Sequence, residues 1–306
     1  MATFSDIPDV VIDHVRKVFA AANSRTSRAL SDHPNMYEET LDHVLVMELS
    51  AQPAAYFAEE EISVVVESHW LGSRRMFGRW EIADIAIFVV LRQGGVLQSR
   101  KVALLQTKRL YANGAVGGEL EDDDFVIGIA RLADRTDPQV SGQRRFSFDD
   151  TSRYRALTAD DEQTHRIDTY AKERGIPVYY GFHNPTDLPQ YTVYPSPDGL
   201  SQAGENRVGM RVVPASEVHA ALSELADGQS PTVADLTLEA PLDEGDETSV
   251  GGWRLERFVA DEVLRCRQGA LFDDTTDPNL RALFFGRTGP ITSAITVTVD
   301  LNSRPD

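Results

Sequence analysis

The sequence predicts an α/β protein with a mixed central sheet flanked by helices. The first observation is a hairpin: residues 84–92 (DIAIFVVLR) and 101–109 (KVALLQTKR) are apolar, β-branched runs, and the turn between them contains Gly94-Gly95. The second is the element order around this hairpin, which periodicity gives as αβββαβ. The third is the length, because 306 residues can bury the core of one large domain or two modest ones.

The part before the hairpin is expected to contain two helices and a strand. Residues 7–22 have helical spacing of their apolar side chains. A second helix at about 36–50 carries one apolar stripe, formed by Leu41, Leu45 and Leu49. Residues 61–68 (EISVVVES) have the composition of a strand.

The sequence pattern after the hairpin predicts helices that alternate with short strands. The clearest helix covers about 158–174, with Thr158 as N-cap and Gly175 as terminator. Further elements are expected along the chain: a helix at 121–135, irregular structure at 136–157, strands at 176–183 and 190–195, and a helix at 214–226.

Three segments are expected along the chain. Residues 1–226 form the main domain, and residues 227–250 have the composition of an acidic linker. Residues 251–306 contain a helix and a final strand (ITSAITVTVDL). One helix and one strand bury too little surface to fold alone, so this C-terminal extension is expected to pack on the main domain.

The overall composition indicates a soluble protein of a reducing compartment. A single cysteine, Cys266, excludes an internal disulfide and a cysteine-rich zinc site. No run approaches the ~20 apolar residues of a membrane span, and the first residues lack the order of a signal peptide. We therefore expect a cytoplasmic protein without a membrane partner.

Polar side chains gather at the open end of the apolar hairpin. Antiparallel pairing about Gly95 places Asp84 beside Gln106, and Lys108 shares the face of Gln106 because side chains repeat every two residues. Alternatively, the strand simply ends there and Lys108 is a solvated edge residue. A carboxylate, an amide oxygen and an ammonium group together can hold a divalent metal and stabilise an attacked phosphate.

This pattern resembles the PD-(D/E)XK nuclease superfamily, whose motif stands here as Ala83-Asp84 and Gln106-Thr107-Lys108. Ala83 replaces the usual proline and Gln106 replaces the usual acid, as in the Gln-x-Lys versions of the motif. The resemblance is anchored in roughly residues 36–185. It implies a restriction-endonuclease-like αβββαβ core and a Mg²⁺-dependent (or Mn²⁺-dependent) endonuclease, with restriction or anti-phage defence as its role.

The catalytic candidates are therefore Asp84, Gln106 and Lys108, of which the first two would bind metal. Because Gln106 removes one negative charge, another acid is expected nearby. Glu38 is the best supplement, as a fourth catalytic candidate and a third metal ligand, since it shares the stripe of Leu41 on the second helix. The alternative is a first-turn glutamate favoured by the helix dipole, which applies equally to Glu39.

Nucleic acid, with DNA favoured over RNA, is the expected partner, although the net charge of −18 opposes phosphate binding. The candidate contacts are polar side chains around the motif: Arg74, Arg75, Arg109 and, by analogy with family branches that place a glutamine there, Gln163.

Two rivals of other classes remain open. The first is a catalytically silent module that uses the same cleft to bind nucleic acid or a partner protein, and the second is a phosphoesterase that acts on small molecules. Because a cytoplasmic nuclease must be restrained, a regulatory protein partner or a homo-oligomer is also expected.

Overall fold

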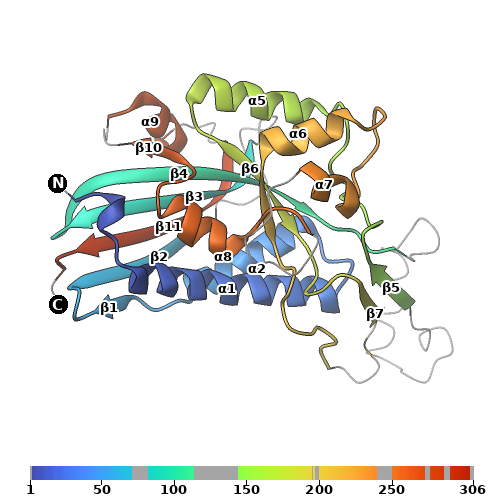
Figure 1. Cartoon of the computed structure of the whole chain (residues 1–306), viewed down its shortest axis with the longest axis horizontal. Helices are drawn as coiled ribbons and strands as arrows, with labels where there is room; N and C mark the ends of the chain where they lie inside the picture. Colours follow the sequence, from blue (N-terminus) through green and yellow to red (C-terminus); the bar gives the residue numbers. More distant parts are fainter. Residues whose placement is uncertain are drawn as a thin grey trace.

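The computed structural model describes the chain in eight stretches: 2–70, 82–113, 144–194, 196, 200–239, 250–272, 276–285 and 290–303. Within them, a nine-stranded mixed sheet forms the centre of the molecule and helices cover both of its faces (Figure 1). The predicted α/β class with a mixed central sheet is confirmed.

Eight strands follow one another across the sheet in the spatial order β1 (Ala55–Phe57), β2 (Ile62–Trp70), β11 (Ile291–Leu301), β3 (Ala83–Gln93), β4 (Val96–Arg109), β6 (Val178–His183), β8 (Arg211–Pro214) and β9 (Trp253–Arg254). Strand β10 (Ala270–Phe272) pairs with β4 outside this path. A separate two-stranded sheet joins β5 (Arg144–Phe148) to β7 (Gln190–Tyr194).

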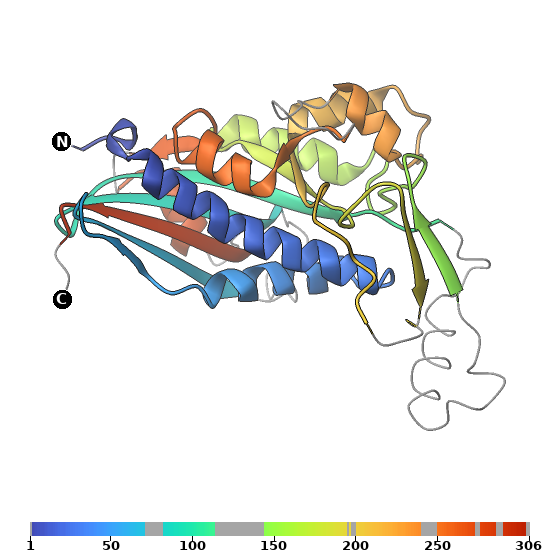
Figure 2. The ribbon, with the colours of Figure 1, turned by 60° about the horizontal axis from the view of Figure 1, so that its bottom comes forward.

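The helices form one layer on each face of the sheet (Figures 1 and 2). One face is covered by η1 (Phe4–Asp6), α1 (Asp9–Asp32), α2 (Glu38–Ser50), α8 (Leu255–Arg257) and the π-helical turn η3 (Phe258–Val263). The other face is covered by α5 (Glu162–Arg174), α6 (Ala215–Ser223), α7 (Val233–Glu239) and α9 (Pro278–Phe285). None of the described helices is long and apolar enough to cross a membrane.

Beyond a bulge near its turn, the hairpin of β3 and β4 has the pairing about Gly95 that the sequence predicts. The strands pair antiparallel from Ile85 opposite Leu105 to Leu91 opposite Ser99, and a bulge follows Leu91. Gly94 and Gly95 have φ values of 57° and 79° in the turn, a region that glycine occupies without a steric penalty. This register brings the beginning of β3 beside the end of β4.

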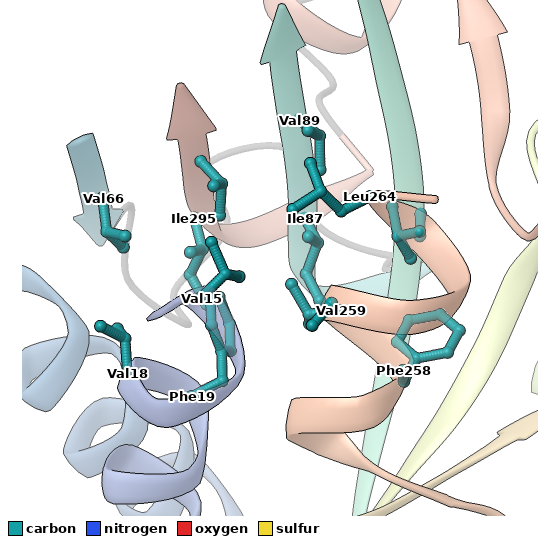
Figure 3. Packing of buried hydrophobic residues seen from close by; sticks show 14 of the residues in the cluster. Val15, Val18, Phe19, Val66, Ile87, Val89, Phe258, Val259, Leu264 and Ile295 are labelled. Atoms are coloured by element: carbon teal, nitrogen blue, oxygen red, sulfur yellow. The ribbon is translucent and has the colours of Figure 1, made fainter. Parts of the chain in front are cut away.

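The alternation of side chains along β3 divides the core into two clusters. Ile85, Ile87, Val89 and Leu91 face α1, whereas Ala86 and Phe88 face the opposite helices. In the first cluster, Ile87 and Val89 pack with Val15 and Phe19 of α1 and with Val259 of η3 (Figure 3).

The C-terminal strand occupies a central place that the sequence did not indicate. Strand β11 lies between β2 and β3, antiparallel to the former and parallel to the latter. The extension is thus part of the sheet, and β2 and β3, consecutive in the predicted core, do not pair directly.

Three other expectations differ from the structure. The first helix continues beyond residue 22 to Asp32, because its polar residues are buried and bonded: Asn23 donates to Glu256 Oε2 at 2.8 Å and Thr26 donates to the Ala22 carbonyl at 3.0 Å. Strand β5 lies within the segment expected to be irregular, and helix α7 lies within the expected linker.

The helix expected over 158–174 begins later than predicted. Asp161, not Thr158, is its N-cap and accepts a hydrogen bond from the Gln163 backbone N–H, so α5 begins at Glu162. The helix expected at 121–135 lies outside the described residues.

Candidate functional site

The four catalytic candidates meet where β4 ends, β3 begins and α2 begins. Asp84 stands opposite Gln106, as the register requires, and its Oδ2 accepts a hydrogen bond of 2.5 Å from Gln106 Nε2. The same oxygen accepts the Thr107 backbone N–H at 2.8 Å. The structure therefore joins the two halves of the predicted motif through the Asp84 carboxylate.

Lys108 is not a solvated edge residue, because only 5 % of its surface is exposed. Its Nζ lies 3.7 Å from Glu38 Oε1, and the other oxygen of Glu38 accepts the Arg109 backbone N–H at 3.0 Å. Glu38 thus points toward β4, as its position on the apolar stripe predicted. Its neighbour Glu39 is exposed, as expected for a residue that only benefits from the helix dipole.

A further acid, Asp42, lies at the site and was not among the sequence candidates. It is 2 % exposed, its Oδ1 lies 2.8 Å from His183 Nε2, and its Oδ2 accepts from Thr107 Oγ1 at 2.7 Å. The available signal was its spacing: Asp42 follows Glu38 by four residues and precedes Leu45 by three, so it shares the buried stripe. A carboxylate inside an apolar stripe needs a partner.

The buried negative charge at this site exceeds the positive charge. Burial, then the carboxylates of Asp42 and Glu38, raise the pKa of Asp84 to about 7 against the opposing effect of Lys108. Burial and the Asp42 carboxylate also raise the pKa of Glu38, although Lys108 opposes this. The cluster therefore favours either a bound proton or a bound cation.

The hydroxyl of Thr107 supports the same conclusion. Its Oγ1 lies 2.7 Å from Asp42 Oδ2 and 3.0 Å from Asp84 Oδ2. A hydroxyl group has a single hydrogen, so it can donate to only one of these oxygens. The second contact is a hydrogen bond only when that carboxyl group is itself protonated, which agrees with the raised pKa of Asp84.

Two polar atoms at the site are buried and have no hydrogen-bond partner among the described residues. They are Gln106 Oε1 and His183 Nδ1. The amide nitrogen of Gln106 donates to Asp84, so the amide oxygen remains able to accept a hydrogen bond or to bind a cation.

Asp84 and Gln106 fit a hard divalent cation as far as the donor chemistry goes. Such ions prefer carboxylate and amide oxygens. The two N–H donors of Asp84 both bind Oδ2, and among the described residues no hydrogen bond engages its Oδ1. Among the residues with a described position, no group of three His, Cys, Asp or Glu side chains could hold a metal ion. A metal here would therefore depend on the neutral amide of Gln106.

Two of the predicted nucleic-acid contacts, Arg109 and Gln163, have a described position, and neither directs its side chain to the four catalytic candidates through a described hydrogen bond or ion pair. Arg109 is buried, and its guanidinium donates to the carbonyls of Pro34 at 2.8 Å and Met36 at 2.7 Å, so it anchors the chain before α2 instead of facing solvent. Within the described part of the chain, no hydrogen bond or ion pair joins Gln163 to the four catalytic candidates. Arg74 and Arg75 lie outside the described residues.

Comparisons with protein-family models, with curated protein sequences and with solved structures found no match to this chain.

Proposed function

We propose that this chain is a metal-dependent endonuclease of the PD-(D/E)XK type, in its Gln-x-Lys version, and that it hydrolyses phosphodiester bonds of DNA. One observation carries the proposal: Asp84, Gln106 and Lys108 meet at one end of the hairpin, in a cluster where carboxylates outnumber the lysine and where the Gln106 amide oxygen has no hydrogen-bond partner among the described residues. Apolar side chains would fill this position at less cost in a purely structural hairpin, because buried polar groups are expensive.

The site residues would have different roles in the reaction. Asp84 and Gln106 would hold the ion, and a bound Mg²⁺ supplies charge neutralisation at the phosphate oxygens. Lys108, buried beside Glu38, places its ammonium group where it can orient a water or neutralise charge that develops on the phosphate. Glu38 fixes the lysine, because it also binds the Arg109 backbone N–H and cannot swing away without breaking that bond.

The arrangement of the elements supports this assignment. Along the chain, α2, β2, β3, β4, α5 and β6 follow the αβββαβ order that the resemblance requires, with the short strands β1 and β5 inserted after α2 and after β4. Strands β3 and β4 are antiparallel, β4 and β6 are parallel, and α2 supplies Glu38 to the hairpin end. Strand β11 departs from such a core, because it lies between β2 and β3 and keeps these two strands from pairing directly.

The second candidate is a catalytically silent module that binds nucleic acid or a partner protein in the same place. The specific observation in its favour is the hydrogen bond from Gln106 to Asp84, which links the two residues without any ion. Gln106 also brings no negative charge to the site, which weakens metal binding.

A plasmid-cleavage assay separates the two candidates. We expect purified protein to convert supercoiled plasmid to nicked or linear DNA in the presence of Mg²⁺ or Mn²⁺, and to lose this activity when EDTA is added. Cleavage that persists in EDTA would contradict the assignment. Absence of cleavage with both ions, together with retained DNA binding, would favour the silent module.

A further inference from the structure

A surface of arginine and tyrosine side chains continues from the end of β4 onto the small β5–β7 sheet. Isolated antiparallel bridges join Tyr111 to Arg153 and Asn113 to Ser147, and Ser147 is paired with Tyr191. Directly opposed residues of antiparallel strands point to the same side. We define the arginine–tyrosine face as the following side chains: Tyr111, Asn113, Arg145, Arg155 and Tyr191.

This face is connected to the candidate site through Arg109. The Arg109 guanidinium lies 3.8 Å from the centroid of the Tyr111 ring, and the Arg155 guanidinium lies 5.3 Å from the same centroid. The Arg109 backbone N–H binds Glu38, which pairs with Lys108. Tyr111 follows Lys108 by three positions of extended chain, a path of about 10 Å. The face therefore begins at the site and leads away from it.

The local charge of this face differs from that of the whole chain. Residues 144–155 contain four arginines and two aspartates, a net charge of +2, in a protein with a net charge of −18. One of these aspartates, Asp149, accepts hydrogen bonds from Asn113 Nδ2 at 2.9 Å and from the Thr151 backbone N–H at 3.0 Å. The other aspartate, Asp150, is exposed, as are Arg145 and Arg155.

Tyr191 adds an aromatic ring that is 77 % exposed on the outer side of β7. Its strand neighbours Gln190 and Thr192 are buried and form hydrogen bonds with Ser31 of α1, so β7 is fixed to the body and its outer side chains are held in place. Arg145 lies two residues from Ser147, the partner of Tyr191, so both side chains are on one side of the β5–β7 sheet. An exposed aromatic ring beside a cationic side chain is a platform on which an unpaired base can stack.

We propose that the arginine–tyrosine face binds single-stranded nucleic acid and directs it toward Lys108. The proposal rests on the nuclease function above and names the substrate form for that site as an unpaired strand, such as the unpaired stretches of a supercoiled plasmid. Arg145 and Arg155 would contact phosphates and Tyr191 would stack on a base. In a duplex the bases are stacked on one another. A duplex can therefore contact Arg145 and Arg155 through its phosphates, but none of its bases can stack on the Tyr191 ring.

Binding measured without cleavage tests this proposal. Fluorescence anisotropy with a labelled 12-nucleotide single strand and with the matching duplex, both in EDTA, reports affinity independently of the chemistry. We expect Tyr191→Ala to weaken single-strand binding at least about fivefold with an unchanged salt dependence. Arg155→Ala is expected to lower the slope of log K against log[salt] by about 0.7 for the single strand.

Matched control variants lie at the opposite end of the sheet. Tyr56 is a 41 % exposed tyrosine on β1, and Arg92 is an exposed arginine at the end of β3 next to the hairpin turn. Figure 1 places the chain termini at this end and β5 and β7 at the other. Tyr56→Ala and Arg92→Ala should leave binding unchanged.

Equal binding of single strand and duplex, or a Tyr191→Ala variant that binds as the wild type does, would overturn the proposal. Either result would leave the plasmid-cleavage assay to decide the nuclease function separately. Conversely, single-strand binding that depends on Tyr191 in a protein that never cleaves would support this face and reject the enzyme.

Discussion

Replacing Lys108 by methionine is expected to reduce metal-dependent cleavage by a factor of about 100 to 1,000, the loss typical of one group that stabilises transition-state charge. Methionine keeps most of the buried side-chain volume and removes only the ammonium group. Glu38 then loses its cationic neighbour, and because burial already raises the pKa of Glu38, it can take up a proton instead of remaining an unpaired charge. The assay is the initial rate of plasmid nicking in Mg²⁺.

Strand β4 offers a matched control for this substitution. Lys101 precedes Lys108 by seven residues on the same strand and is 1 % exposed. Its ammonium group donates a hydrogen bond to the Gln268 carbonyl. Lys101→Met removes the same charge from a comparable environment, and we expect folded Lys101→Met to cleave at nearly the wild-type rate. Equal rates for wild type and Lys108→Met would remove Lys108 from the chemistry.

Asp84→Asn is expected to stabilise the metal-free protein at neutral pH. The unfolded chain ionises Asp84 near 3.8, whereas the folded protein holds the proton until about pH 7. The contribution of neutral Asp84 to the free energy of unfolding is therefore complete below about pH 4. It is lost as the pH rises through 7, because ionisation of Asp84 then favours the unfolded state. Asparagine cannot ionise, so the variant should gain on the order of 2–4 kcal/mol over the wild type at pH 8 and little at pH 4.5.

Urea denaturation of both proteins at pH 4.5 and pH 8, in EDTA, measures this difference. Glu39→Gln is the control, because this glutamate is exposed and one residue from Glu38. Adding Mg²⁺ at pH 8 should stabilise the wild type and leave Asp84→Asn unchanged. If the wild type and Asp84→Asn differ in free energy of unfolding by the same amount at both pH values, ionisation of Asp84 does not destabilise the folded protein.

The local part of the site could be predicted because it depends on short-range geometry. The pairing about Gly95 that the sequence predicts does place Asp84 beside Gln106, but the turn alone does not fix it. At the turn Gln93 pairs with Val96, and the bulge after Leu91 shifts the pairing by one residue into the predicted register. Helical spacing alone directs Glu38 toward the sheet.

The remainder depends on contacts between distant parts of the chain. The apolar alternation of β11 predicts a strand but not its neighbours, and its place between β2 and β3 follows from pairing partners about 200 residues away. The polar half of α1 is buried because Glu256 accepts a hydrogen bond from Asn23, 233 residues earlier. Asp42 was missed for the same reason, since its partners Thr107 and His183 lie on two other strands.

The central claim is that a divalent cation is held by Asp84 and the amide oxygen of Gln106, and calorimetric titration of Mn²⁺ tests it most directly. Gln106→Glu adds a negative charge to the ligand set and should bind Mn²⁺ about tenfold more tightly than the wild type, whereas Gln106→Leu, which lacks the oxygen, should show no binding. Glu39→Ala serves as the control and should bind as the wild type does. If Gln106→Leu binds Mn²⁺ as tightly as the wild type, Gln106 is not a ligand and the proposed metal site is wrong.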